Sequence, residues 1–279
     1  MHRASLDEIR GFYAKLMAGV AGSPDPRLER IFELVPREAF LPPGPWKVKV
    51  SDNKYVETPS ADPVYLYQNV LVALDASKGI NNGEPMLHAR WIGAVAPQPG
   101  EAVTHIGTGT GYYSAILSML VLPGGRLIGF EINEELAVAA RRNLAPFENT
   151  SITVGDAASL KVPPSDVIYV NAGVLAPPEH WLAALRPGAR MIFPWRPSEA
   201  VALAVLVTHG ASGFEIKPLM PAWFIPSAGT SNATSCTLAP DYDSAWSSRS
   251  IHLSRDRSPD DSATAIYKDV WFSSTPIAA

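Results

Sequence analysis

Residues 101–132 read EAVTHIGTGTGYYSAILSMLVLPGGRLIGFEI, and no other stretch of the chain constrains its architecture as strongly. An apolar run at 102–106 precedes glycines at positions 107, 109 and 111. An apolar segment at 112–122 and a second short run at 126–130 follow. The short runs have the length of buried strands, whereas the longer segment behind the glycine turn has the length of a helix. The order strand, turn, helix, strand indicates a parallel α/β sheet.

The same alternation continues to about residue 200. Asn133 is placed to cap a helix whose first turn is acidic (Glu134, Glu135) and whose last turn is basic (Arg141, Arg142), which suits the helix dipole. Further elements are expected as strands at 151–154, 166–170 and 189–193, a helix at 178–185 and a closing strand pair at 201–207 and 214–219. We therefore predict an α/β fold with a doubly wound, mostly parallel seven-stranded sheet and helices on both faces.

The two ends of the chain do not follow this alternation. Helical spacing behind Ser5 and a Pro- and aromatic-rich stretch predict an N-terminal helical lead-in over residues 1–68. The cofactor-binding domain is then expected at 69–225. Residues 226–279 form a C-terminal extension, with loop composition at 226–236 and a terminal hairpin within 263–272. Between these two parts the sequence is polar and gives no periodic pattern, which is typical of a mobile tail.

Composition excludes several classes of protein. The 279 residues carry 23 Lys+Arg and 27 Asp+Glu, a net charge of −4, which argues against nucleic-acid binding. The sequence shows no signal peptide and no apolar stretch of membrane-spanning length, so we expect no membrane association. The lone Cys236 fits a cytoplasmic location. Hydrophobic residues at 47% with charged residues at only 18% predict additional buried surface, such as an interface in a homo-oligomer.

Polar residues fall where the strands end, which is where open α/β sheets hold their ligands. Glu131 follows the second strand and is suited to bind ribose hydroxyls, and Asp156 follows the third, where an adenine edge would lie. Asn171 follows the fourth strand. A nicotinamide dinucleotide would need a glycine where the chain has Tyr112, because that glycine permits close packing of helix on strand. S-adenosyl-L-methionine is therefore the better candidate.

The segment 101–195 resembles the protein-L-isoaspartate O-methyltransferase family, within the class I S-adenosylmethionine-dependent methyltransferases. The similarity rests on Ile106-Gly107-Thr108-Gly109-Thr110-Gly111-Tyr112, Glu131, Gly155-Asp156 and the strand from Leu185 to Pro194, and upstream on Val35-Pro36-Arg37-Glu38-Ala39-Phe40. It extends over roughly residues 25–200. The resemblance implies a methyltransferase fold and these cofactor-binding residues: His105, Gly107, Thr108, Gly109, Gly111, Tyr112, Glu131, Ile132, Asp156, Ala157 and Asn171.

The family's acceptor segment aligns with Asn81 to Ala89, and here the chain departs from the pattern. The serine that the family uses toward its substrate carboxylate is replaced by Gly83, and the neighbouring Glu84 would repel an acidic acceptor unless its charge is paired. Asn82, Glu84 and His88 are the candidate catalytic residues on the acceptor side. No cluster of His and Cys has the spacing of a metal site.

We expect a methyltransferase that acts on a carboxylate oxygen of a peptide, a protein or a small molecule, with altered acceptor specificity. A carboxylate needs no general base, whereas a hydroxyl or an amine would use His88 or Glu84. Two alternatives remain at this point. Gly83 is compatible with a non-catalytic, cofactor-binding regulatory homologue. A nicotinamide-dependent oxidoreductase is disfavoured by Tyr112.

Overall fold

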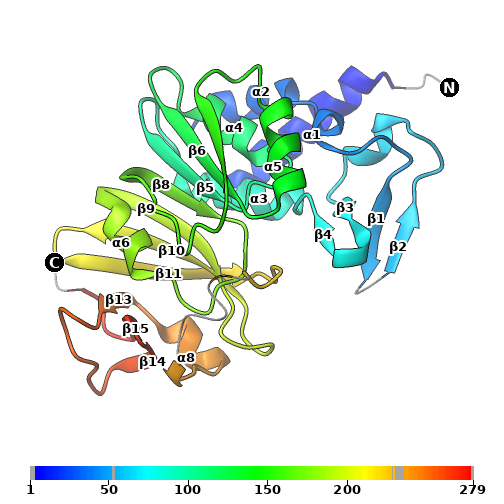
Figure 1. Ribbon diagram of the computed structural model, residues 1–279. Coiled ribbons are helices and arrows are strands. Elements are labelled where there is room, and N and C mark those ends of the chain that lie inside the picture. Colours follow the sequence, from blue (N-terminus) through cyan, green and yellow to red (C-terminus); the bar gives the residue numbers. More distant parts are fainter. Residues whose placement is uncertain (1–3, 52–53, 228, 230–235, 278–279) are drawn as a thin grey trace. The chain divides into compact units, whose positions relative to one another are not determined.

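The computed structural model describes residues 4–51, 54–227, 229 and 236–277 (Figure 1). The chain divides into two compact units. The first comprises residues 1–100, 108–127 and 133–152, and the second comprises 101–107, 128–132 and 153–279. The expected loop at 226–236 lies mostly outside the described residues.

The first unit contains the helical lead-in and the helices of the alternating region. Its α-helices are α1 (Leu6–Ala21), α2 (Arg27–Leu34), α3 (Pro85–Val95), α4 (Tyr112–Leu120) and α5 (Glu134–Asn143), and its 3-10 turns are η1 (Arg37–Phe40), η2 (Pro63–Leu66) and η3 (Ala76–Lys78). The expected caps are present. The Ser5 hydroxyl accepts from Glu8 N at 3.2 Å, and Asn133 Oδ1 accepts from Leu136 N at 3.1 Å. Both side chains satisfy amides that a helix N-terminus leaves open.

Two small antiparallel pairs complete the first unit. Strands β1 (Lys47–Ser51) and β2 (Lys54–Glu57) form one, and β3 (Ala73–Asp75) and β4 (Ile80–Asn81) form the other. A bridge between Val48 and Val72 links them, and Figure 1 shows the two pairs side by side. Trp46, Leu66 and Val72 make a small apolar cluster beneath this link.

The second unit is built on a large sheet whose strand order is β12-β14-β15-β13-β11-β10-β9-β8-β5-β6-β7. Its strands are β5 (Ala102–Ile106), β6 (Arg126–Glu131), β7 (Thr150–Val154), β8 (Ser165–Val170), β9 (Leu185–Trp195), β10 (Leu203–Gly210), β11 (Gly213–Pro221), β12 (Cys236–Leu238), β13 (Ser250–Leu253), β14 (Ala263–Tyr267) and β15 (Val270–Ser273). Strands β5, β8 and β9 pair in parallel, and β9, β10 and β11 pair antiparallel. The seven predicted strands are all present and adjacent in this order.

The sheet continues beyond the seven predicted strands through four strands of the C-terminal extension. Helix α8 (Tyr242–Ser247) and β13 lie in the stretch that gave no pattern, so this stretch is ordered rather than a mobile tail. β13 pairs with both β11 and β15, and β14 and β15 form an antiparallel pair joined at Lys268-Asp269 (Figure 1). Phe272 of β15 stacks on Trp195 of β9 at 4.0 Å, which joins the extension to the apolar core of this unit.

Candidate active site

The ends of β5 and β8 meet closely in the second unit. Gly107 has φ +76°, and its N–H donates to Phe130 O at 2.8 Å. A Cβ at position 107 would lie 3.3 Å from the carbonyl oxygen of Asn171. Position 107 therefore requires glycine for both its backbone conformation and its spacing.

His105 and Asn171 form a buried pair at this point. The Asn171 side-chain nitrogen lies 2.8 Å from His105 Nε2. Burial lowers the pKa of His105 to about 3, so the imidazole is neutral at physiological pH and accepts from the amide. Asn171 Oδ1 is then a buried acceptor that has no partner among the described residues. A buried polar atom of this kind indicates a missing ligand or water.

The acidic residues at the ends of β6 and β7 are held near each other in the second unit. Glu131 is 6% exposed, and its carbonyl accepts from Gly155 N at 2.9 Å. Asp156 Oδ1 accepts from Ala158 N at 2.9 Å. The carbonyl of Ala157 accepts from Trp181 Nε1 of α6 (Glu179–Ala184), also at 2.9 Å. Helix α6 thus fixes the Asp156-Ala157 turn, whereas the side chain of Ile132 is exposed.

The segment that follows β11 lies along the same strand ends. The Gly173 N–H donates to Ile225 O at 2.8 Å, and Ser227 N donates back to Gly173 O at 2.7 Å. A Cβ on Gly229 would overlap the carboxylate of Asp156. Loop composition alone did not place this segment, because its contacts lie 52 to 73 residues away in the sequence.

The rest of the glycine-rich turn belongs to the first unit. Gly109 and Gly111 have φ +55° and +98°, and a Cβ on Gly111 would lie 3.0 Å from the side chain of Leu144. Thr110 Oγ1 donates to Phe40 O at 2.5 Å, which anchors the turn, whereas Thr108 Oγ1 is buried without a partner among the described residues.

Tyr112 begins α4 directly after this turn. Its hydroxyl lies 3.4 Å from that of Tyr13, and its ring meets Phe40 edge to face. Burial raises the pKa of the Tyr112 phenol, which is therefore un-ionised. The side chain of Tyr112 is therefore enclosed within the first unit.

The candidate acceptor segment precedes α3 in the first unit. His88 on α3 stacks on Tyr113 of α4, with ring centroids 3.7 Å apart and an interplanar angle of 20°. Gly83 has φ +83°, and a Cβ there would lie 2.7 Å from His88 Cδ2, 2.8 Å from Tyr113 Cε2 and closer still to His88 Nε2. A side chain at position 83 would therefore clash with both rings unless they shift.

Arg37, which was not among the candidate site residues, organises this segment from behind. It is fully buried, and its guanidinium donates to the carbonyls of Leu66 and Val70 and, at 3.1 Å, to Asn82 Oδ1. Asn82 Oδ1 also accepts from Val72 N at 3.2 Å. Asn82 Nδ2 is consequently a buried donor without an acceptor among the described residues. The sequence signal available for Arg37 was its place in the segment Val35–Phe40, which carries part of the family resemblance.

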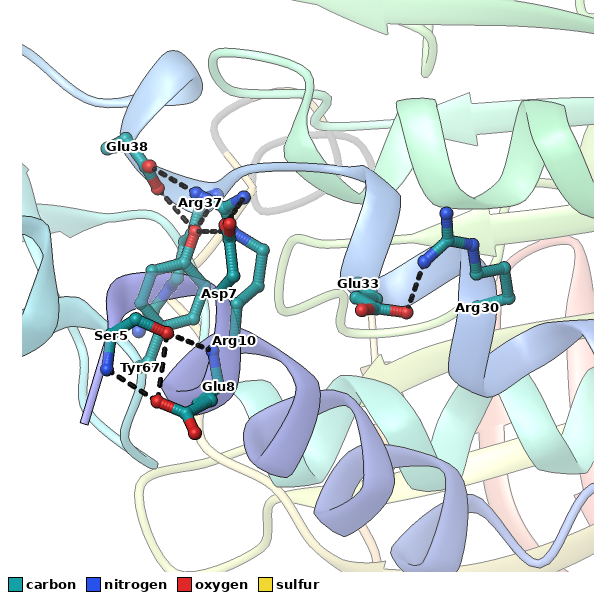
Figure 2. Close-up of polar contacts among 9 residues, drawn as sticks. All are labelled: Ser5, Asp7, Glu8, Arg10, Arg30, Glu33, Arg37, Glu38 and Tyr67. Carbon is teal, nitrogen blue, oxygen red and sulfur yellow. Dashed lines mark hydrogen bonds and ion pairs between the residues drawn. The ribbon is translucent and has the colours of Figure 1, made fainter.

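A polar network of Arg10, Glu38 and Tyr67 supports the backbone at Arg37, as Figure 2 shows. Arg10 Nε donates to the Tyr67 hydroxyl at 2.8 Å, and that hydroxyl donates to Glu38 Oε2 at 2.5 Å. Burial and the Glu38 carboxylate raise the pKa of Tyr67. The Tyr67 oxygen also accepts from Arg37 N at 3.3 Å, so the network fixes the backbone that carries Arg37.

The carboxylate of Glu84 accepts a hydrogen bond from a neutral amide. Its Oε1 accepts from Asn69 Nδ2 at 2.6 Å, and Asn69 Oδ1 accepts from Met86 N at 2.8 Å. This pairing holds the Glu84 charge beside Asn69, so Glu84 serves to fix the start of α3. Trp195, at the end of β9, is fully buried, and its Nε1 donates to Leu175 O. No group of potential metal ligands occurs within the described residues.

Comparison with known proteins tests the resemblance. A sequence model of the family described as protein-L-isoaspartate(D-aspartate) O-methyltransferase (PCMT) matches residues 25–232. The chain belongs to this family. The PCMT match covers both the strand ends of the second unit and the acceptor segment of the first, and it stops before β12.

Individual relatives agree with this assignment. The chain is 29% identical over 196 residues to a protein-L-isoaspartate O-methyltransferase of Ignicoccus hospitalis, covering 69% of this chain and 84% of that protein. It is 33% identical over 165 residues to one from Methanopyrus kandleri, covering 57% of this chain and 65% of the relative's length.

Solved structures confirm the predicted α/β methyltransferase fold. The structure of one protein-L-isoaspartate O-methyltransferase aligns with a TM-score of 0.65 at 25% identity, and the alignment covers 79% of this chain and 66% of that chain. A second structure, described as a putative protein-L-isoaspartate O-methyltransferase from Plasmodium falciparum in complex with S-adenosyl-L-homocysteine, has a TM-score of 0.62 at 15% identity. The alignment covers 79% of this chain and 98% of that chain. None of the described helices has both the length and the apolar character needed to cross a bilayer.

Proposed function

We propose that this chain is an S-adenosyl-L-methionine-dependent O-methyltransferase that methylates a carboxylate of a protein or peptide, with an acceptor site that differs from the family pattern. The observation that carries the proposal is the family match across residues 25–232, which includes the glycine-rich turn and the acidic strand ends. The comparisons favour this function over a non-catalytic homologue or a nicotinamide oxidoreductase.

The residues present fit the cofactor. In the second unit, the unpartnered Asn171 Oδ1 suits an ammonium group, Glu131 suits ribose hydroxyls, and Asp156 suits an adenine amine. We propose the remaining cofactor contacts from the sequence pattern: His105, Gly107, Thr108, Gly109, Gly111, Tyr112, Ile132 and Ala157. When bound, S-adenosyl-L-methionine supplies a methyl group on a positively charged sulfur.

The chemistry asks little of acid–base groups. A carboxylate is already ionised at neutral pH, so it attacks without losing a proton. The work of the protein is to align the carboxylate oxygen with the methyl carbon at near-attack distance and to exclude water. His105 is neutral and buried, which suits it to position the side chain of Asn171. Its lowered pKa argues against a role as a base.

Other properties follow as proposals. We propose domain limits of 1–68, 69–225 and 226–279, a homo-oligomer interface and a cytoplasmic location. The exposed, unpaired thiol of Cys236 supports a reducing compartment.

Asn82, Glu84 and His88 are proposed on the acceptor side, with Glu84 acting through the start of α3.

The test is transfer of a labelled methyl group to an isoaspartyl peptide, after calorimetry has established S-adenosylhomocysteine binding on the same sample. We expect label that is released by mild base, because a methyl ester hydrolyses readily. A protein that binds S-adenosylhomocysteine yet labels no isoaspartyl peptide would contradict the acceptor proposal. A protein that does not bind it would contradict the cofactor proposal.

A further inference from the structure

A cavity of about 470 Å³ lies within the first unit, apart from the residues proposed for the cofactor and the acceptor carboxylate. It is bordered by residues 42–47, which lead into β1, by residues 73–80 of the β3–β4 pair, and by the first turn of α5. All of these segments belong to one compact unit. The volume falls in the range of about 300–1,000 Å³ that is typical of ligand pockets.

The cavity adjoins the glycine-rich turn. Leu74 of β3 lines the cavity, and a Cβ on Gly109 would lie 3.6 Å from Leu74 Cδ1, which is ordinary van der Waals contact. A single side chain therefore separates the cavity from the turn that is proposed to hold the methyl donor. A peptide whose acceptor residue reaches this turn can place a neighbouring residue in the cavity.

Two walls of the cavity present apolar side chains. Pro42, Pro45 and Trp46 contribute to one wall, and Leu74 and Ile80 contribute to the other. Trp46 is 5% exposed, and its Nε1 donates to Pro42 O at 2.8 Å, so the indole ring is fixed in place. Such walls suit the apolar stem of a long side chain, which can bury its methylene groups while its charged end meets a polar partner.

The polar lining offers one carboxylate to a ligand. Asp75 is engaged, because its Oδ1 accepts from Ser77 N at 3.0 Å and its Oδ2 lies 3.2 Å from Lys78 Nζ. Glu135, in the first turn of α5, is exposed, and its carboxylate has no hydrogen bond or ion pair with the residues that the structure describes. Lys47 is the one basic side chain among the lining residues described. A carboxylate beside apolar walls suits lysine or arginine.

We propose that this cavity binds a basic side chain of the acceptor peptide, arginine or lysine, close to the residue that is methylated. This inference rests on the proposed function. Glu135 pairs with the cation, the rings of Pro45 and Trp46 contact its stem, and Lys47 weakens binding by repulsion. The cavity then selects acceptors by their sequence, because the isoaspartyl carboxylate is the same in every such peptide.

The experiment uses fluorescein-labelled isoaspartyl hexapeptides that carry arginine, leucine or glutamate at each position flanking the isoaspartate. Fluorescence anisotropy in the presence of S-adenosylhomocysteine measures Kd, and methyl transfer measures KM. We expect arginine at one position to lower both at least fivefold relative to leucine, and glutamate to raise both. Glu135→Gln should abolish this preference for arginine, and Lys47→Gln should increase it. Glu148→Gln is the matched control, because it removes an exposed carboxylate of the same unit that does not line the cavity.

The outcomes separate this inference from the proposed function. Equal Kd values for arginine and leucine peptides at every position would overturn the inference, and so would a preference for arginine that survives Glu135→Gln. Methyl transfer without a preference for arginine would contradict the cavity assignment alone. A preference for arginine in Kd without transfer to any peptide would support the cavity and contradict the proposed function. Failure to bind any of the peptides would overturn both.

Discussion

Individual residues in this protein are constrained by backbone conformation and by space, and Gly83 shows both constraints. Gly83 and Gly79 have similar positive φ values, +83° and +67°, but a Cβ at Gly79 meets nothing within 4 Å. Gly79→Ala should therefore cost only the backbone strain, about 1 kcal/mol. Gly83→Ala adds overpacking against His88 and Tyr113 and should cost about 3 kcal/mol. Urea denaturation followed by circular dichroism measures both, and equal losses would show that the rings give way.

Burial of His105 disfavours the charged form of its imidazole. The unfolded chain protonates this imidazole near pH 6.5, whereas the folded chain, with a pKa of about 3, does not. Because the pKa is lowered on folding, the stabilisation is complete above pH 6.5 and declines as the pH falls toward 3. Lowering the pH from 7.5 to 5.5 should cost about 1 kcal/mol through His105 alone. His105→Gln should be less sensitive to pH than wild type in parallel urea titrations, and identical slopes would contradict the assignment.

The sequence marked some candidate site residues and not others, for a physical reason. Gly107, Glu131, Asp156 and Asn171 follow strands, and the position of a strand end can be read from the local pattern. The His88–Tyr113 stack joins residues 25 apart on two helices, and Arg37 reaches carbonyls some 30 residues away. No local pattern encodes such packing, so the acceptor side was predicted only through family resemblance.

At the scale of elements, the C-terminal hairpin is part of the core of its unit. Phe272 is fully buried and stacks on Trp195 with an interplanar angle of 5°. Phe272→Ala should lower the free energy of unfolding by about 3–5 kcal/mol, because a large cavity opens against Trp195. Trp223→Ala, at a residue that is 63% exposed, should change it by about 0.5 kcal/mol or less. Thermal and urea unfolding measure both variants, and a small loss for Phe272→Ala would show that the extension folds independently of the sheet.

The sequence did not predict how far the sheet extends beyond the seven expected strands. The strands within residues 102–219 alternate with helices or close in a hairpin, so the local sequence pattern marks each of them. β13 instead lies between β11 and β15, which are distant from it in sequence, and its four residues, Ser250–Leu253, carry no distinctive alternation. Register between strands that are remote in sequence is set by tertiary packing, which a short polar stretch does not reveal.

At the scale of the whole molecule, binding of the cofactor product should stabilise the folded chain by mass action. S-adenosylhomocysteine at one hundred times its Kd contributes about 2.7 kcal/mol, which should raise the melting temperature by about 5 °C. NADH at the same concentration should give no shift. Glu131→Gln weakens acceptance of ribose hydroxyls and should reduce the shift, whereas Glu148→Gln, an exposed carboxylate in the loop before β7, should retain it. Differential scanning fluorimetry resolves these outcomes. A shift with NADH, or one unaffected by Glu131→Gln, would mean that the acidic end of β6 serves another ligand. The family assignment would then describe the ancestry of the fold rather than its present chemistry.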